Sequence, residues 1–181
     1  MDLVDTLDQT FQHAHQIIAG VRPEQYDDKT PCTEWTVRDL LNHEIGVVAG
    51  LGAAATGTPR DTFTLGADPA GQFAEAAAAA LAAWRTPGVM DRTLDAGAGP
   101  MPGHVLASIN LVDTATHTWD LAKATDQPAK LPDDVAVAAL DAGRMIITSP
   151  EMRGGRFGPE VPAPDGADAT DRLVAFLGRT P

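Results

Sequence analysis

Apolar side chains recur every three or four residues along most of the chain, which is the spacing of a helix with one buried face. In the first segment this pattern runs through Leu3, Leu7, Phe11, Ala14 and Ile18. Thr36 and Asp39 have the spacing of a capping box and mark the start of a second helix. The pattern predicts helices over residues 2–21, 36–55, 69–84, 102–125, 133–147 and 169–177.

The segments between these helices are rich in Pro, Gly and polar residues. Residues 22–34 are a polar connector, residues 56–69 a long loop, and Arg92 to Leu94 have the pattern of a short strand. Residues 152–166 contain too many Gly and Pro to be helical throughout. With no internal repeat and no long linker, we expect a single domain over residues 1–181. Its predicted fold is all-α, an up-down four-helix bundle with short additional helices and a minor strand pair.

Composition and charge narrow the classes of partner. The chain has 181 residues with 13 Lys and Arg against 25 Asp and Glu, a formal net charge of −12 at pH 7. A surface of this sign repels nucleic acid and anionic membranes. No apolar stretch has the length of a membrane span, and the N-terminus lacks the basic and apolar regions of a signal peptide, so we expect a cytoplasmic protein. The single cysteine, Cys32, excludes an intrachain disulfide and a thiolate metal cluster.

Three residues have the chemistry of metal ligands. Asp113 and His117 are four residues apart on the predicted fourth helix, so their side chains lie one turn apart on the same face. They flank the apolar stripe that we expect on this helix, which consists of Val105, Ile109, Val112, Thr116 and Trp119. His43 flanks the stripe of the second helix in the same way. Imidazole and carboxylate ligands suit Zn, Ni, Fe or Mn, and three protein ligands leave positions for water or substrate. The pattern alone is more typical of a histidine paired with a carboxylate, so both interpretations stand.

Two acidic residues near these positions have alternative interpretations. Glu44 falls at the centre of the second helix's apolar stripe, so it is either paired and buried or faces the site as a base with a raised pKa. Asp120 lies three residues after His117 and is an alternative ligand, an acceptor that orients an imidazole, or a helix-surface acid.

Other residues with functional chemistry are expected to have structural roles. We expect Trp35 and Trp119 to pack in the core, and Cys32 to be a buried, inert thiol unless a positive neighbour lowers its pKa. His13 and His15 are two residues apart and point to different faces of the first helix. His104, at the start of the fourth helix, is expected to be exposed.

Two segments carry a resemblance to a known family. Trp35-Thr-Val-Arg-Asp-Leu-Leu-Asn-His43 and His117-Thr-Trp-Asp-Leu-Ala122 resemble the DinB-like superfamily. The resemblance is closer to its actinobacterial branch related to the N-terminal domain of mycothiol-dependent maleylpyruvate isomerase. The segment Arg156-Phe-Gly-Pro-Glu-Val-Pro and the last helix through Arg179 are similar to the same branch, so the similarity spans nearly the whole chain.

The resemblance implies a four-helix bundle with a divalent-metal site, whose ligands map onto His43, Asp113 and His117. Zn is the first expected metal, with Ni, Fe or Mn as alternatives. Asp113 stands where the branch often has Glu, so its side chain is one methylene shorter. The activity implied is that of an S-transferase or isomerase that uses mycothiol, a low-molecular-weight thiol, on an electrophilic small molecule.

Two alternative functions remain from the sequence. One is metal-dependent hydrolysis with the same ligands, and the other is a non-catalytic metal-binding or stress-response protein of the same fold. The resemblance also implies a homodimer, since the Ala-rich third helix allows close helix approach. The alternative is that this helix packs within its own bundle.

Overall fold

The computed structural model describes residues 2–59, 62–153 and 157–181. In this part of the chain the prediction of a mostly helical fold is confirmed, and the helices are α1 (Leu3–Ala19), α2 (Val37–Thr56), α3 (Pro69–Trp84), α4 (Gly103–Ala124), α5 (Asp133–Ile146) and α6 (Ala169–Phe176). None of these helices is both long and apolar enough to cross a membrane. Residues 60–61 of the predicted loop, and residues 154–156 with Arg156 of the C-terminal motif, lie outside the described residues.

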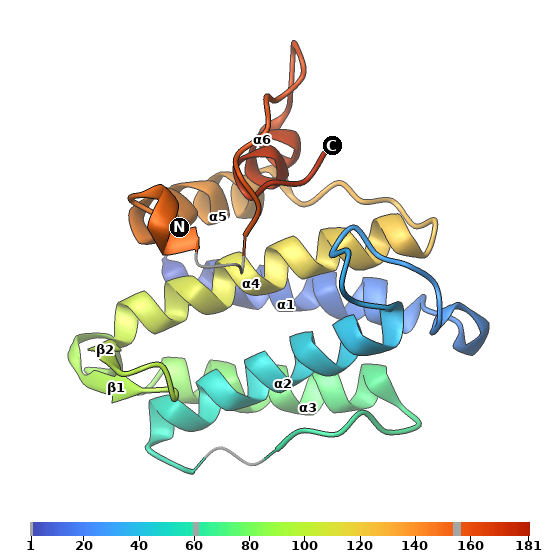
Figure 1. Ribbon diagram of the computed structural model, residues 1–181. Coiled ribbons are helices and arrows are strands. Elements are labelled where there is room, and N and C mark those ends of the chain that lie inside the picture. Colours follow the sequence, from blue (N-terminus) through green and yellow to red (C-terminus); the bar gives the residue numbers. More distant parts are fainter. Residues whose placement is uncertain (1, 60–61, 154–156) are drawn as a thin grey trace.

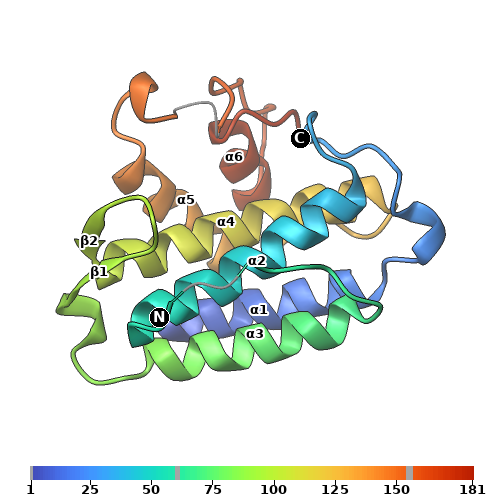
Figure 2. The same cartoon turned by 60° about the horizontal axis from the view of Figure 1, so that its bottom comes forward.

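Helices α1 to α4 form a four-helix bundle in which α1 and α2 each pack against both α3 and α4 (Figures 1 and 2). Helices α1 and α4 run in one direction and α2 and α3 in the other (Figure 1). The Gln127 side-chain amide donates to the Ile17 carbonyl at 2.9 Å and so ties the ends of α1 and α4 together. The predicted up-down order is therefore wrong between α2 and α3, which are parallel (Figure 1). Their connection crosses the length of the bundle and places Phe63 and Leu65 beside α2.

Helix α4 is buried on nearly all sides, because it packs against α1, α2 and α5. The one-sided apolar stripe predicted for it is therefore wrong. Val105 and Ile109 of that stripe are half-buried, whereas Leu106 and Leu111 outside it are fully buried. Polar residues of this helix are consequently held inside the protein, where each needs a partner.

The predicted minor strand pair is confirmed, one residue later than expected. Strand β1 (Thr93–Asp95) pairs antiparallel with β2 (Pro100–Pro102), and Leu94 lies opposite Met101. In the turn, Asp95 Oδ1 accepts hydrogen bonds from the backbone N–H groups of Gly97 and Gly99 at 2.7 and 3.2 Å. Both glycines have positive φ, which favours residues without a side chain.

The alanine-rich helix α3 packs against α2 and α1 within its own bundle. Ala80 is fully buried, and a Cβ built on Gly52 of α2 would lie 2.9 Å from the Ala80 Cα. Small residues therefore let these two helices approach closely, as one of the two sequence interpretations expected. The homodimer stays a prediction.

We expect Gly52→Val to destabilise the protein by about 1–3 kcal/mol, because the added side chain must displace the α3 backbone in a packed interior. The matched control is Ala78→Val, which places the same branched side chain at an exposed position of α3. It should cost less than about 1 kcal/mol, through helix propensity alone. Chemical denaturation of both variants measures this difference. Equal losses would contradict the close approach at Gly52.

Candidate metal centre

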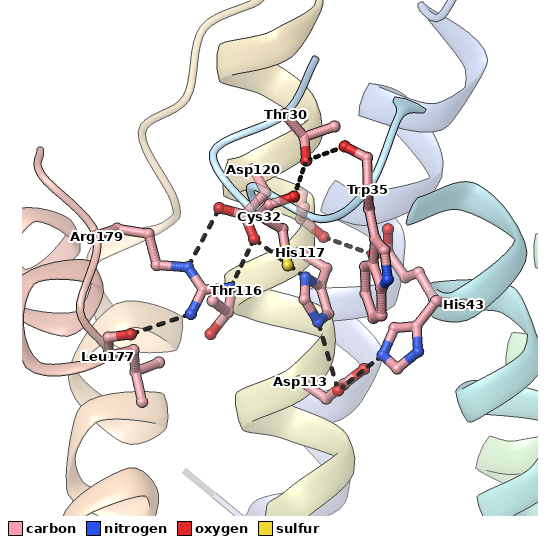
Figure 3. A network of polar contacts seen from close by, with 12 residues as sticks. Thr30, Cys32, Trp35, His43, Asp113, Thr116, His117, Asp120, Leu177 and Arg179 are labelled. Carbon is pink, nitrogen blue, oxygen red and sulfur yellow. Dashed lines mark hydrogen bonds and ion pairs between the residues drawn. The ribbon is translucent and has the colours of Figure 1, made fainter. Parts of the chain in front are cut away.

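The structure brings His43, Asp113 and His117 together between α2 and α4 (Figure 3). Asp113 Oδ1 lies 3.2 Å from His43 Nε2 and 3.6 Å from His117 Nε2. One ligand atom from each residue lies within 4.8 Å of the other two. The three residues singled out from the sequence therefore converge on one point.

Local sequence and helix packing both place these side chains. Thr36 caps α2 by accepting the Asp39 N–H at 3.3 Å, and this fixes where His43 falls on the helix. Directly after His43, Glu44 accepts the hydroxyl proton of Thr118 of α4 at Oε1, at 3.0 Å. This buried contact fixes the register between the two helices, so that His43 faces Asp113.

Asp113 is held as an anion. Burial alone would raise the pKa of its carboxyl, but His117, His43 and Arg179 outweigh this effect and lower the pKa below the usual value. Its second oxygen, Oδ2, is buried and has no hydrogen-bond partner among the described residues. A buried anionic oxygen without a partner, next to two imidazole nitrogens, fits a divalent cation, and this donor set suits Zn, Ni, Fe or Mn.

Asp120 is fully buried, so the interpretation of this residue as a helix-surface acid is wrong. Its Oδ2 atom lies 3.0 Å from Nδ1 of His117 and 2.8 Å from Nη2 of Arg179. Burial would raise the pKa of Asp120, but His117 and Arg179 lower it further than burial raises it, so the carboxylate stays ionised. An ionised carboxylate can only accept, so the Nδ1–H of His117 donates to Asp120, and Nε2 is the nitrogen that faces Asp113. Asp120 thus has the geometry of the acceptor that orients an imidazole, one of its predicted roles.

Arg179 is a residue of this network that the sequence analysis missed, because it only appeared there as the last residue of a C-terminal motif. It is buried, and Figure 3 shows it contacting Asp120 from the C-terminal segment, which is distant from Asp120 in the sequence. A buried arginine needs an anionic partner, but no local spacing relates position 179 to position 120.

Trp35 belongs to the connector before α2. It is half-buried and packs against the edge of the core, and its ring also covers the site. Its ring centroid lies 4.4 Å from that of His43 and 5.6 Å from that of His117. The backbone N–H of Trp35 donates to the backbone carbonyl of Cys32 at 2.8 Å. The Thr30 hydroxyl oxygen lies 2.9 Å from the backbone carbonyl oxygens of both Cys32 and Trp35. These bonds fold the connector over the two imidazoles.

Cys32 is half-buried beside His117 and Asp120, and ligand atoms of these three residues also lie within 4.8 Å of one another. Burial and the nearby Asp120 raise the pKa of the thiol, and Arg179 offsets this only in part. Cys32 therefore stays a thiol at neutral pH, in keeping with an unreactive cysteine.

Glu44 is fully buried and paired, which is the first of its two predicted environments. Oε1 accepts from Thr118, and Oε2 has no partner among the described residues. Burial raises the pKa of Glu44 well above its usual value against the effect of the Thr118 bond, and the charges of Asp113 and Asp120 raise it further. The protonated, neutral form of Glu44 is therefore favoured in the folded chain.

The remaining candidates lie away from this centre. Trp119 is buried and His104 is exposed, as expected. Among the described residues, His13 and His15 join neither group of ligand atoms.

A cleft of about 930 Å³ reaches the site at His43. Its walls come from the connector, from α2 and from the crossing segment before α3. Phe63 packs over Gly46, where an added Cβ would lie 3.2 Å from the phenylalanine Cβ, so the absence of a side chain at position 46 shapes this wall. The residues that line the cleft are Glu34, Trp35, Arg38, Asp39, Asn42, His43, Gly46, Thr62, Phe63, Thr64 and Leu65.

The fold and the site together define a class of protein: helical bundles that hold a site of histidine and carboxylate side chains between two helices. The sequence profile of the family described as Mycothiol maleylpyruvate isomerase N-terminal domain matches residues 7–122, which include all three candidate ligands but not Arg179. The chain therefore belongs to this family, as its resemblance predicted.

Curated relatives extend the similarity beyond the matched domain. The chain is 38% identical over 169 residues to an uncharacterized protein of Mycobacterium tuberculosis, found in the strains CDC 1551 / Oshkosh and ATCC 25618 / H37Rv. The alignment covers 91% of this chain and 90% of each relative. No solved structure matches the chain significantly.

The raised pKa of Glu44 gives a testable pH dependence of stability. Below the ordinary glutamate pKa, Glu44 is protonated in both the folded and the unfolded chain. As pH rises, the unfolded chain ionises first, so stability is lost until the folded-state pKa is reached. Glu44→Gln cannot ionise, so its free energy of unfolding relative to wild type should increase from pH 4 to pH 8 in EDTA. Urea denaturation at both pH values measures this change.

The control is Glu75→Gln on the exposed face of α3, whose difference from wild type should not change with pH. A constant difference for Glu44→Gln would mean that the pKa of Glu44 is the same in the folded and the unfolded chain.

Proposed function

We propose that the chain is a divalent-metal-binding protein that uses His43, Asp113 and His117 as ligands and acts on a low-molecular-weight thiol as an S-transferase or isomerase. The observation that carries the proposal is the position of the Asp113 carboxylate between two imidazoles, with one buried oxygen unpartnered. Family membership supports the choice of mycothiol as the thiol.

The protein contributes a fixed ligand set with room beside it. His43 and Asp113 side chains keep 29% and 19% of their exposure, so this side of the site is open, while His117 is nearly closed off. A divalent ion held here supplies positive charge that favours the thiolate form of a bound thiol at neutral pH. Trp35 covers the imidazoles and restricts water around the ligand atoms.

The cleft fits a polar ligand of moderate size. Its volume of about 930 Å³ lies within the range of sites for small molecules. Amide, hydroxyl and charged side chains alternate in its lining with Trp35, Phe63 and Leu65. This mixture suits a hydroxyl-rich thiol such as mycothiol together with an electrophile, which approach the site from the His43 side.

Replacement of single ligands should separate metal binding from a structural role. Asp113→Asn keeps the size of the side chain but removes the charge that offsets a divalent cation, so zinc affinity should fall at least tenfold, since loss of an outer-shell partner alone costs about 10–100-fold. His43→Ala should abolish tight binding, because two ligands on one helix remain. Calorimetric titration with zinc measures both effects.

Thermal melts of the same variants in EDTA provide the control. Metal-free Asp113→Asn should lose less than about 1 kcal/mol, because the substitution removes a buried charge and its desolvation cost. A variant that is weaker in EDTA, yet stabilised by zinc as much as wild type, would assign Asp113 a purely structural role.

Thiol chemistry is tested with mycothiol and monobromobimane, with and without zinc. In this reaction the thiol sulfur bonds to the bromomethyl carbon, bromide leaves with the bonding electrons, and the thiol proton passes to the buffer. We expect metal-dependent formation of the fluorescent conjugate by wild type, and at least a tenfold lower rate for His43→Ala, since this variant loses a ligand.

Replacing mycothiol with cysteine tests whether the cleft selects its thiol, and the rate should then fall. Tight zinc binding without turnover across Zn, Ni, Fe and Mn would instead support the non-catalytic alternative.

A further inference from the structure

Arg179 makes a two-point contact with Asp120 from the C-terminal end of the chain, beyond α6 (Figure 3). The Nη2 atom of Arg179 lies 2.8 Å from Asp120 Oδ2, and its Nε atom lies 3.3 Å from Asp120 Oδ1. The Nη1 group donates to the Leu177 carbonyl at 3.0 Å, which fixes the guanidinium relative to its own backbone. The planar fork of arginine thereby fixes both the position and the rotation of the carboxylate.

The fixed carboxylate in turn faces one nitrogen of His117. Asp120 Oδ2 accepts the Nδ1 proton at 3.0 Å, while Nε2 of the same ring points to Asp113 Oδ1 at 3.6 Å. A neutral imidazole carries one proton, and only the nitrogen without it can bind a metal. The contact between Nδ1 and Asp120 therefore determines which nitrogen of His117 carries the proton, and it does so on the opposite side of the ring from Asp113.

We propose that Arg179 is a positioning residue for the candidate metal centre: its fork holds the Asp120 carboxylate so that His117 keeps its proton on Nδ1 and presents Nε2 to the metal position. This inference rests on the metal site of the proposed function. It assigns to the C-terminal segment a role in that site, without contact between Arg179 and the ligand position.

The group formed by Cys32, His117 and Asp120 is an alternative use of the same carboxylate. A cation at that point would compete with the guanidinium, which already contacts both Asp120 oxygens, and with the Nδ1 proton. The geometry therefore favours Asp120 as an acceptor for His117 over Asp120 as a ligand. Cys32→Ser distinguishes the two roles, because only the second requires the sulfur.

The test compares Arg179→Met, which keeps the aliphatic stem, with Arg179→Lys, which keeps the charge but not the fork. The matched control is Arg172→Met, at an exposed position of α6. In metal-free protein, at a pH high enough for His117 to be neutral, long-range ¹⁵N–¹H NMR correlations, assigned with His117→Ala, report the His117 tautomer. We expect the Nδ1–H form in wild type and in the control, and mixed tautomers in Arg179→Met.

Zinc affinity is the second measurement. Arg179→Met should bind zinc about 10–100-fold more weakly than wild type, as is typical when an outer partner of a ligating histidine is lost. The zinc affinity of Arg179→Lys should lie between those of wild type and Arg179→Met, and the zinc affinity of Cys32→Ser should equal that of wild type. If Arg179→Met does not fold in a thermal melt, Arg179→Lys takes its place in both measurements.

An unchanged tautomer and unchanged zinc affinity in the folded Arg179 variants would overturn the proposal, as would an Nε2–H tautomer in wild type. A tenfold loss of zinc affinity in Cys32→Ser would also overturn it, by placing the ion on the Cys32 side. Failure of wild type to bind any metal would refute the proposed function, whereas the tautomer comparison would still test Arg179.

Discussion

Helix α4 holds two carboxylates inside the bundle, the fully buried Asp120 and the half-buried Asp113, and an anion removed from water must be matched by positive charge or hydrogen-bond donors. Asp120 receives both from Arg179 and His117, whereas Asp113 lies between two imidazoles and keeps one oxygen unpartnered. The difference separates their roles. The satisfied carboxylate is part of the folded structure, and the unsatisfied one is the feature to which a cation can add.

The need to pair these carboxylates explains why segments that are distant in the sequence converge on α4 around Asp113 and Asp120. The connector supplies Trp35, α2 supplies His43, and the C-terminal segment supplies Arg179 (Figure 3). The parallel arrangement of α2 and α3 adds the crossing segment with Phe63, which forms the outer wall of the cleft. Burial between α2 and α4 favours the neutral form of Glu44, and this limits the negative charge beside Asp113.

Much of the local structure follows from the sequence, because helix periodicity, capping and turn residues act over a few positions. The helices, the start of α2 at Thr36 and the strand pair near residue 93 were all predictable within a few residues. The spacing of Asp113 and His117 also fixed their shared face, since four residues span about one helical turn. The motif around His43 and the one after His117 were sufficient to indicate the family.

Contacts between segments were decided by tertiary packing alone. The sequence could not show that α4 is enclosed by three helices, because one-sided periodicity assumes a single buried face. Trp35 covering the imidazoles and Arg179 pairing with Asp120 depend on how the connector and the C-terminal segment fold over α4. The sequence by itself therefore determined the helices and the ligand types, because these depend on local spacing. The tertiary structure decided which charges meet, because burial and pairing across long separations arise only when the helices pack.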